Sequence, residues 1–148
     1  MKVIALIGLV SIEKIELAIQ LATHYTWETD QSVTLIDNVT RLAIDAARLS
    51  DEPLIRVKDD ISEKLVDVLH NVHTDIAIVA VTETAELDKL FFNLEGLLNY
   101  MPDIELHTVG LIDTRTCDCF PHLRQKLEAY ADVHFLAPFD VHEVLEVI

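Results

Sequence analysis

The residues that could do chemistry at the start of the chain are Gly8, Ser11 and Lys14. They lie between an unbroken apolar run and a stretch whose apolar residues recur at helical spacing. A glycine turn, the free N–H groups of a helix start and a lysine ammonium together are able to hold a phosphate. Asp37 stands at the carboxyl end of the next apolar run, where it could also cap the following helix. The chemistry that this arrangement indicates is nucleotide binding.

The elements that would position these residues can be read from periodicity. The run Val3–Ile7 has no polar alternation, which is typical of a strand covered on both faces in a parallel sheet. From Ile12 onward the spacing becomes helical, and Ser11 stands where an N-cap residue is expected. On this helix we expect Lys14 to be an ordinary surface lysine.

The phosphate-loop motif Gly-x-x-x-x-Gly-Lys-Ser/Thr is only partly present. Counting from Gly8, four residues are followed by Glu13, Lys14 and Ile15. The side chain of Glu13 would obstruct close approach of phosphate and add a negative charge, and Ile15 cannot bind magnesium. In place of an anion, the carboxylates of Glu13 and Glu16 would offset the positive end of the helix dipole. The departures predict that ATP and magnesium binding are lost.

The stretch GLVSIEKIELAIQLA resembles the deviant phosphate loop of the MinD/ParA ATPases, roughly GKGGVGKTTLALNLA. The signature lysine of that family falls on Leu9, its paired glycines on Val10 and Ser11, and its magnesium-binding threonine on Ile15. The positions that match are Gly8, Lys14, Leu17, Ala18, Leu21 and Ala22. The resemblance implies a P-loop NTPase-like fold. The residues left to bind a nucleotide in an active protein would be Gly8, Ser11, Lys14 and Asp37.

Later segments follow the same family in order. Asp37 falls on the first acid of the family's Asp-x-Asp pair, which helps to position the attacking water, but Val39 replaces the second acid. Asp113 stands where the family has an asparagine that touches the base. The resemblance also implies that the family's Walker B and switch segment is deleted or reduced, which would be a second loss of catalytic machinery.

The other group of residues that could carry chemistry is Cys117, Cys119 and His122. Two thiolates one residue apart and an imidazole three positions on could bind zinc or nickel, and a second copy in a homodimer could complete four ligands. Nickel-insertion proteins related to MinD and ParA use loop cysteines at a dimer interface. The alternative interpretation is a pair of reduced thiols on a cytosolic loop.

Alternation of strands and helices predicts a three-layer α/β/α domain with a mostly parallel, doubly wound sheet. A receiver-like domain is the structural alternative, although it usually needs acids after the first strand. We expect Trp27 to cover the core and Gly96 to allow close helix packing. The expected strands are 3–7, 32–37, 54–57 at an edge, 75–84, 104–113 and 133–136. The first expected helix starts at 12 and ends in the segment 24–31, which makes the loop to the next strand and contains Trp27. Asp60 or Ser62 is expected to open a helix that reaches about residue 72. The other expected helices are 41–49, 85–100, 120–130 and one after 139.

Bulk composition limits the class of protein. The 148 residues fit one domain, 1–148, with a formal charge of −15 from 26 acids and 11 bases. This acidity argues against binding to nucleic acid or anionic membranes, and it fits either a self-repelling surface or a face for a basic partner. No apolar run approaches the roughly 20 residues of a membrane span, and no signal peptide is evident, so we expect a cytoplasmic protein.

The leading functional prediction is a non-catalytic pseudo-ATPase that acts as a protein-interaction or regulatory subunit of a larger assembly and needs no cofactor. Its partner would be a protein, and the family resemblance suggests an active ATPase of the same family. Two alternatives stay open: a weak ATPase or GTPase that uses Lys14 and Asp37, and a metal carrier that uses the cysteine pair.

Overall fold

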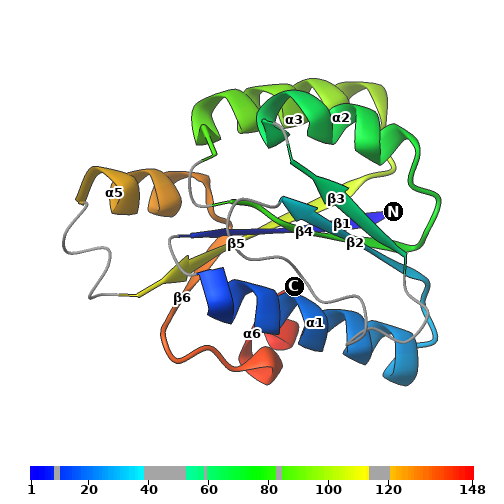
Figure 1. The fold of residues 1–148 in the computed structure, drawn as a ribbon, viewed down its shortest axis with the longest axis horizontal. Coiled ribbons are helices and arrows are strands. Elements are labelled where there is room, and N and C mark those ends of the chain that lie inside the picture. The colour runs from blue at the N-terminus through cyan, green and yellow to red at the C-terminus, as the bar shows by residue number, and fades with distance from the viewer. Residues whose placement is uncertain (9–10, 39–52, 59, 83–84, 114–120) are drawn as a thin grey trace.

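A parallel sheet runs through the middle of the structure, with helices on both of its faces (Figure 1). The computed structural model describes residues 1–8, 11–38, 53–58, 60–82, 85–113 and 121–148. In chain order the elements are β1 (Lys2–Gly8), α1 (Ser11–Glu28), β2 (Val33–Asn38), β3 (Leu54–Val57), α2 (Ile61–His70), β4 (Ile76–Ala80), α3 (Leu87–Tyr100), β5 (Glu105–Ile112), α5 (Pro121–Tyr130), β6 (Val133–Leu136) and α6 (Val141–Val147).

The described strands form a six-stranded sheet in the order β3-β2-β4-β1-β5-β6. Every neighbouring pair is parallel, and Lys2 of β1 lies opposite Ile76 of β4 on one side and Glu105 of β5 on the other. The predicted α/β class and parallel sheet are confirmed. The short edge strand predicted at 54–57 is confirmed as β3.

The core has two halves because strand side chains alternate between the faces of the sheet. From β1, Val3 and Ile7 pack in the half beneath α2 and α3, and Ile4 and Leu6 pack in the half covered by α1 and α6. Leu127 places α5 on the same side as α2 and α3. Burial on both faces explains why β1 reads as an unbroken apolar run.

Local signals set the start of α2. The carboxylate of Asp60 caps the helix by accepting hydrogen bonds from the amide and the hydroxyl of Ser62, at 3.0 and 2.6 Å. These two bonds lower the pKa of Asp60. A side chain that accepts from the free N–H groups of the first turn is the ordinary way to stabilise a helix start.

Two sequence predictions about the helices are wrong. Trp27 belongs to α1, which continues to Glu28, and it is 69% exposed instead of covering the core. It lies two positions after the buried Tyr25, which is about 200° around a helix and therefore on the outer side. At Gly96 in α3 an added Cβ would meet nothing within 4 Å, so this glycine does not serve close packing.

The helix predicted at 41–49 lies outside the described residues. None of the helices in the described ranges has both the length and the apolar character that a membrane crossing requires.

Candidate functional site

The first feature of the site is the glycine that ends β1. Gly8 has φ +147°, a conformation that L side chains rarely adopt, and a Cβ built on it would lie 2.3 Å from the carbonyl oxygen of Leu111. Gly8 and Leu111 face each other in the register of β1 and β5. The last position of β1 therefore requires glycine because of both its backbone shape and the closeness of β5.

Lys14 is buried, and the expectation of a surface lysine is wrong. Its side chain is in the first turns of α1 with 3% of its surface exposed, and its Nζ donates to the carbonyl oxygens of Gly8 at 2.7 Å and Val81 at 2.6 Å. Gly8 ends β1, and Val81 directly follows β4. The ammonium thus joins the start of α1 to the carboxyl ends of two central strands.

A second polar side chain continues these contacts across the sheet. Asn38, the last residue of β2, is 6% exposed and donates from Nδ2 to the carbonyl oxygen of Val57 in β3 at 3.0 Å. Its Oδ1 accepts from the backbone N–H of Thr82 at 3.1 Å. We call Lys14, Asn38 and the backbone groups that they bind the strand-end clamp. It links β3, β2, β4, β1 and α1.

The sequence reading missed Asn38. The signal available was an amide side chain directly after a run of buried residues, at the carboxyl end of a strand. A polar side chain buried at such a place must find hydrogen-bond partners, so its role could have been inferred from burial alone.

Asp37 precedes Asn38 in β2 and is 2% exposed. In the parallel ladder it lies opposite Ala80 of β4, next to Val81. The structure therefore brings three of the predicted residues, Gly8, Lys14 and Asp37, to the carboxyl edge of the central strands. The fourth, Ser11, begins α1, and its side chain lies outside the described part of the chain.

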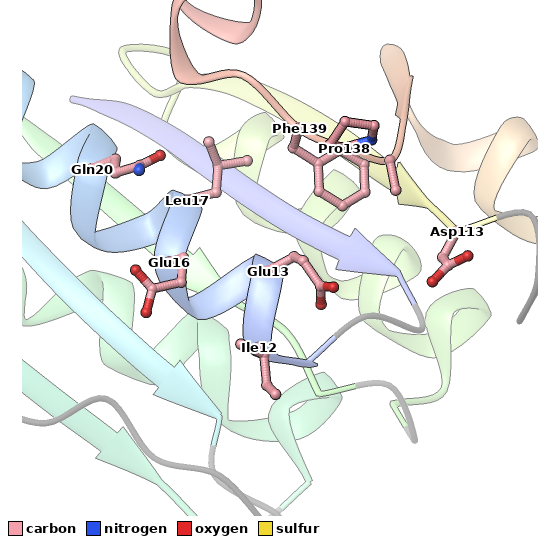
Figure 2. Close-up of a pocket in the computed structure, with 9 residues that line it drawn as sticks. Ile12, Glu13, Glu16, Leu17, Gln20, Asp113, Pro138 and Phe139 are labelled. Atoms are coloured by element: carbon pink, nitrogen blue, oxygen red, sulfur yellow. The ribbon is translucent and has the colours of Figure 1, made fainter.

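A pocket of about 530 Å³ adjoins this edge between the first turns of α1 and the segment that connects β6 to α6. Glu13 of α1 and Asp113, which follows β5, lie on opposite sides of it, with Pro138 and Phe139 beside them (Figure 2). The remaining lining residues include Ile12, Glu16, Leu17 and Gln20 of α1. The pocket combines an apolar wall with carboxylates.

These carboxylates determine which ligands the pocket disfavours. Glu13 is exposed in the first turn of α1, where its charge offsets the positive end of the helix dipole. Two like charges about 4 Å apart repel by about 1 kcal/mol in water and by about 4 kcal/mol near a protein surface. A phosphate group close to Glu13 or Asp113 would meet repulsion of this order.

Of the three predicted metal residues, only His122 lies in the part of the chain that the structure describes. Cys117 and Cys119 fall in 114–120, outside the described residues. His122 is the second residue of α5, and it is exposed. Over the described ranges, no group of three or more His, Cys, Asp or Glu side chains is arranged to hold a metal ion.

Comparison with solved structures identifies the fold. The chain is similar to the signal recognition particle receptor FtsY from Elizabethkingia anophelis, with 16% identity and a TM-score of 0.59 over 91% of this chain and 48% of that one. It is also similar to Zn(II)-bound YjiA GTPase from E. coli, with 17% identity and a TM-score of 0.59 over 99% of this chain and 53% of that one. The fold is that of a P-loop NTPase domain.

A third P-loop NTPase structure, FlhF complexed with GMPPNP and Mg²⁺, has 13% identity and a TM-score of 0.55 over 91% of this chain and 55% of that one. The chain spans about half the length of these three structures. No family model matches the chain, and no curated protein does.

In a P-loop NTPase domain the connection between the first strand and the following helix is the phosphate loop. Here that connection runs from Gly8 at the end of β1 to Ser11 at the start of α1. Lys14 stands at the motif position whose ammonium contacts phosphate in active members. In this chain the same ammonium binds the carbonyl oxygens of Gly8 and Val81.

Proposed function

We propose that this chain is a non-catalytic, MinD/ParA-like pseudo-ATPase that acts as a protein-interaction or regulatory subunit of a larger assembly. The observation that carries the proposal is the engagement of the Lys14 ammonium with two carbonyl oxygens at the ends of β1 and β4. A phosphate would have to compete with both hydrogen bonds. Bonds to a charged group contribute roughly 1.5 to 3 kcal/mol each.

The charges around the phosphate loop support the same proposal. The motif's second glycine is replaced by Glu13, and its magnesium-binding Ser/Thr by Ile15. Glu13 and Asp113 both line the adjoining pocket. The phosphates of a nucleotide would meet the carboxylates of Glu13 and Asp113. Its magnesium ion would meet the aliphatic side chain of Ile15, which cannot bind it.

An interaction role fits the rest of the surface. The chain has a formal charge of −15, and it exposes large apolar side chains that include Phe92 and Tyr100. A contiguous apolar patch with a polar rim is typical of interaction sites. Phe92 lies with Phe91 and Leu98 in one groove that Glu95 also lines. An active ATPase of the MinD/ParA type is the first partner to test, and a second copy of this chain is the next.

The test is isothermal titration of the purified chain with ATP and with GTP, each with and without magnesium. We expect dissociation constants weaker than about 1 mM and no gain from magnesium. Magnesium-dependent binding at about 1 μM or tighter would overturn the proposal. Adenosine and guanosine are the controls, because they probe the pocket without phosphate charge.

The enzyme alternative rests on Lys14 and Asp37, which are both buried at the carboxyl edge of the central strands. It predicts slow ATP or GTP turnover that disappears in Lys14→Ala. Because this substitution removes buried hydrogen bonds, the variant's far-UV circular dichroism must first match that of the parent chain. Native mass spectrometry of the chain as purified adds an independent result, since retained ADP, ATP or GDP would favour the enzyme.

A further inference from the structure

A groove of about 510 Å³ is lined by residues of α3, β5 and α5. Figure 1 shows where these three elements lie. Its floor comes from the first half of β5, and its walls come from the two helices. We call it the α3–α5 groove, and the residues that matter here are Asp88, Phe91, Phe92, Glu95, Leu106 and Tyr130. In the described structure no other segment covers Phe92, which is 75% exposed.

Aromatic side chains give the groove its apolar surface. The rings of Phe91 and Tyr130 are stacked with centroids 4.7 Å apart and planes 7° from parallel, so they join the two walls. Phe92 lies next to this pair along α3 and projects into solvent. Rigid aromatic groups supply a large contact area at small entropic cost, which is why they are enriched in interfaces.

Carboxylates line the same groove and are held in place. Asp88 accepts from Nζ of Lys126 at 2.7 Å and from the hydroxyl of Tyr130. Asp132 accepts from the backbone N–H of Thr108 at 2.9 Å. Glu95 is exposed three residues after Phe92, and therefore lies on the same side of α3. Lys126 offsets the charge of Asp88, so the negative rim of the groove comes from Glu95 and Asp132.

The charge decides between occupants. A second copy docked through this groove would bring two negative rims together, and each chain carries a formal charge of −15. Nucleic acid and anionic lipid surfaces would be repelled in the same way. A segment with apolar side chains and lysines or arginines has the complementary pattern, since its apolar groups would cover Phe92 and its cations would face Glu95 and Asp132.

We propose that the α3–α5 groove is the docking site for a basic, amphipathic segment of a partner protein. Phe91 and Phe92 would receive the apolar side chains of that segment, and Glu95 and Asp132 would pair with its lysines or arginines. The inference rests on the proposed interaction role and adds the place and the chemistry of the partner. It does not depend on the strand-end clamp.

The probe is a display library of short random peptides, selected against the full chain and then synthesised for titration. We expect the enriched peptides to combine Lys or Arg with large apolar residues. Phe92→Ser and Glu95→Lys should each weaken their binding by about tenfold or more. The matched controls are Trp27→Ser in α1, which also removes an exposed aromatic ring, and Glu146→Lys in α6, which also reverses an exposed charge. Both positions lie on the opposite face of the sheet, so these variants should alter binding by less than about twofold.

Several outcomes would overturn the inference. Enrichment of acidic or uncharged peptides would contradict the charge argument, and equal binding to Phe92→Ser and the parent chain would place the site elsewhere. If no peptide is enriched more strongly on the parent chain than on the Phe92→Ser variant, the groove is not the docking site. A dimer in analytical ultracentrifugation that Phe92→Ser dissociates would assign the groove to a second copy. The nucleotide titrations are independent, so tight ATP binding would overturn the proposed function without removing a mapped peptide site.

Discussion

The strand-end clamp buries polar side chains, whereas the α3–α5 groove exposes an apolar one. In the clamp, Lys14 and Asn38 are 3% and 6% exposed, and they donate hydrogen bonds to carbonyl oxygens at the ends of strands. In the groove, Phe92 is 75% exposed beside carboxylates. The clamp uses polar atoms to hold the fold together, and the groove leaves the Phe92 ring exposed, where it contributes little to the stability of the isolated chain.

The difference between the two regions indicates where a ligand or partner would bind. Members of this fold bind ligands at the carboxyl ends of the strands, around the helix that follows the first strand. Here that edge contains hydrogen bonds that are internal to the protein. The surface with an exposed aromatic side chain beside carboxylates is the α3–α5 groove, which lies between two helices instead. The following substitutions test whether the two regions differ in this way.

The largest expected effect is that of Lys14→Met in the clamp. The substitution keeps the length of the side chain and removes the ammonium, so two buried carbonyl oxygens lose their donor. We expect a loss of about 3 to 5 kcal/mol in the free energy of unfolding, measured by urea denaturation. Lys64→Met, at an exposed site of α2, is the control and should stay within about 0.5 kcal/mol. A stable Lys14→Met chain would show that the clamp is not structural.

Asn38→Ala should have the next largest effect. It removes the donor to the Val57 carbonyl oxygen and the acceptor for the Thr82 amide, which ties β2 to β3 and β4. Leaving these buried groups unpaired should cost about 2 to 3 kcal/mol of unfolding free energy. Amide hydrogen exchange at Thr82 provides a local readout. If exchange there is unchanged in the variant, the bond to Asn38 is not formed in solution.

Gly96→Ala should act in the opposite direction. Gly96 is inside α3, and an added Cβ meets no atom within 4 Å, so alanine should raise the unfolding free energy by about 0.5 to 1 kcal/mol. Gly8→Ala is the contrasting variant, because its Cβ would collide with the Leu111 carbonyl at 2.3 Å. A rise in thermal midpoint for the first and a fall for the second would confirm that the glycines serve different purposes. A destabilised Gly96→Ala chain would mean that the surface of α3 at this point is covered.

The smallest effect concerns pH and the groove. The hydrogen bond from Lys126, followed by that from Tyr130, lowers the pKa of Asp88 in the folded chain. A lowered folded pKa means that the stabilisation is complete above the unfolded value of about 3.9 and is lost as pH falls through the folded value. The stability difference between the parent chain and Asp88→Asn should therefore be constant above about pH 5 and shrink below about pH 4.

Urea denaturation of both chains across this pH range measures the difference. A difference that does not change with pH would show that the contacts of Asp88 with Lys126 and Tyr130 do not depend on its charge. The site is exposed, so the clamp variants should show far larger changes at every pH.

The fold was predictable because its signals are local. Val3–Ile7 reads as a doubly covered strand, and the short stretch 54–57 reads as an edge, and both are found as β1 and β3. Asp60 was one of two residues expected to open the next helix, and it caps α2. Hydrophobic period and capping chemistry depend on neighbours in sequence, which is why they can be read without a structure.

The site was less predictable because its partners are distant in sequence. The burial of Lys14 depends on the carbonyl oxygen of Val81, which is 67 residues away, and no local pattern reports that contact. Asn38 depends in the same way on Val57 and Thr82. Trp27 was misplaced because the end of α1 was set too early. The role of the cysteine pair, outside the described residues, remains a prediction from sequence.

The position of β1 in the sheet has a consequence for how the chain is made. β1 is formed from residues 2–8, yet its two neighbours are β4 at 76–80 and β5 at 105–112. During synthesis this apolar strand leaves the ribosome long before either neighbour exists, and it cannot pair until most of the chain has followed. Such long-range pairing slows folding and leaves apolar segments exposed meanwhile. The nascent chain should therefore depend on chaperones that cover β1 until β4 has been made.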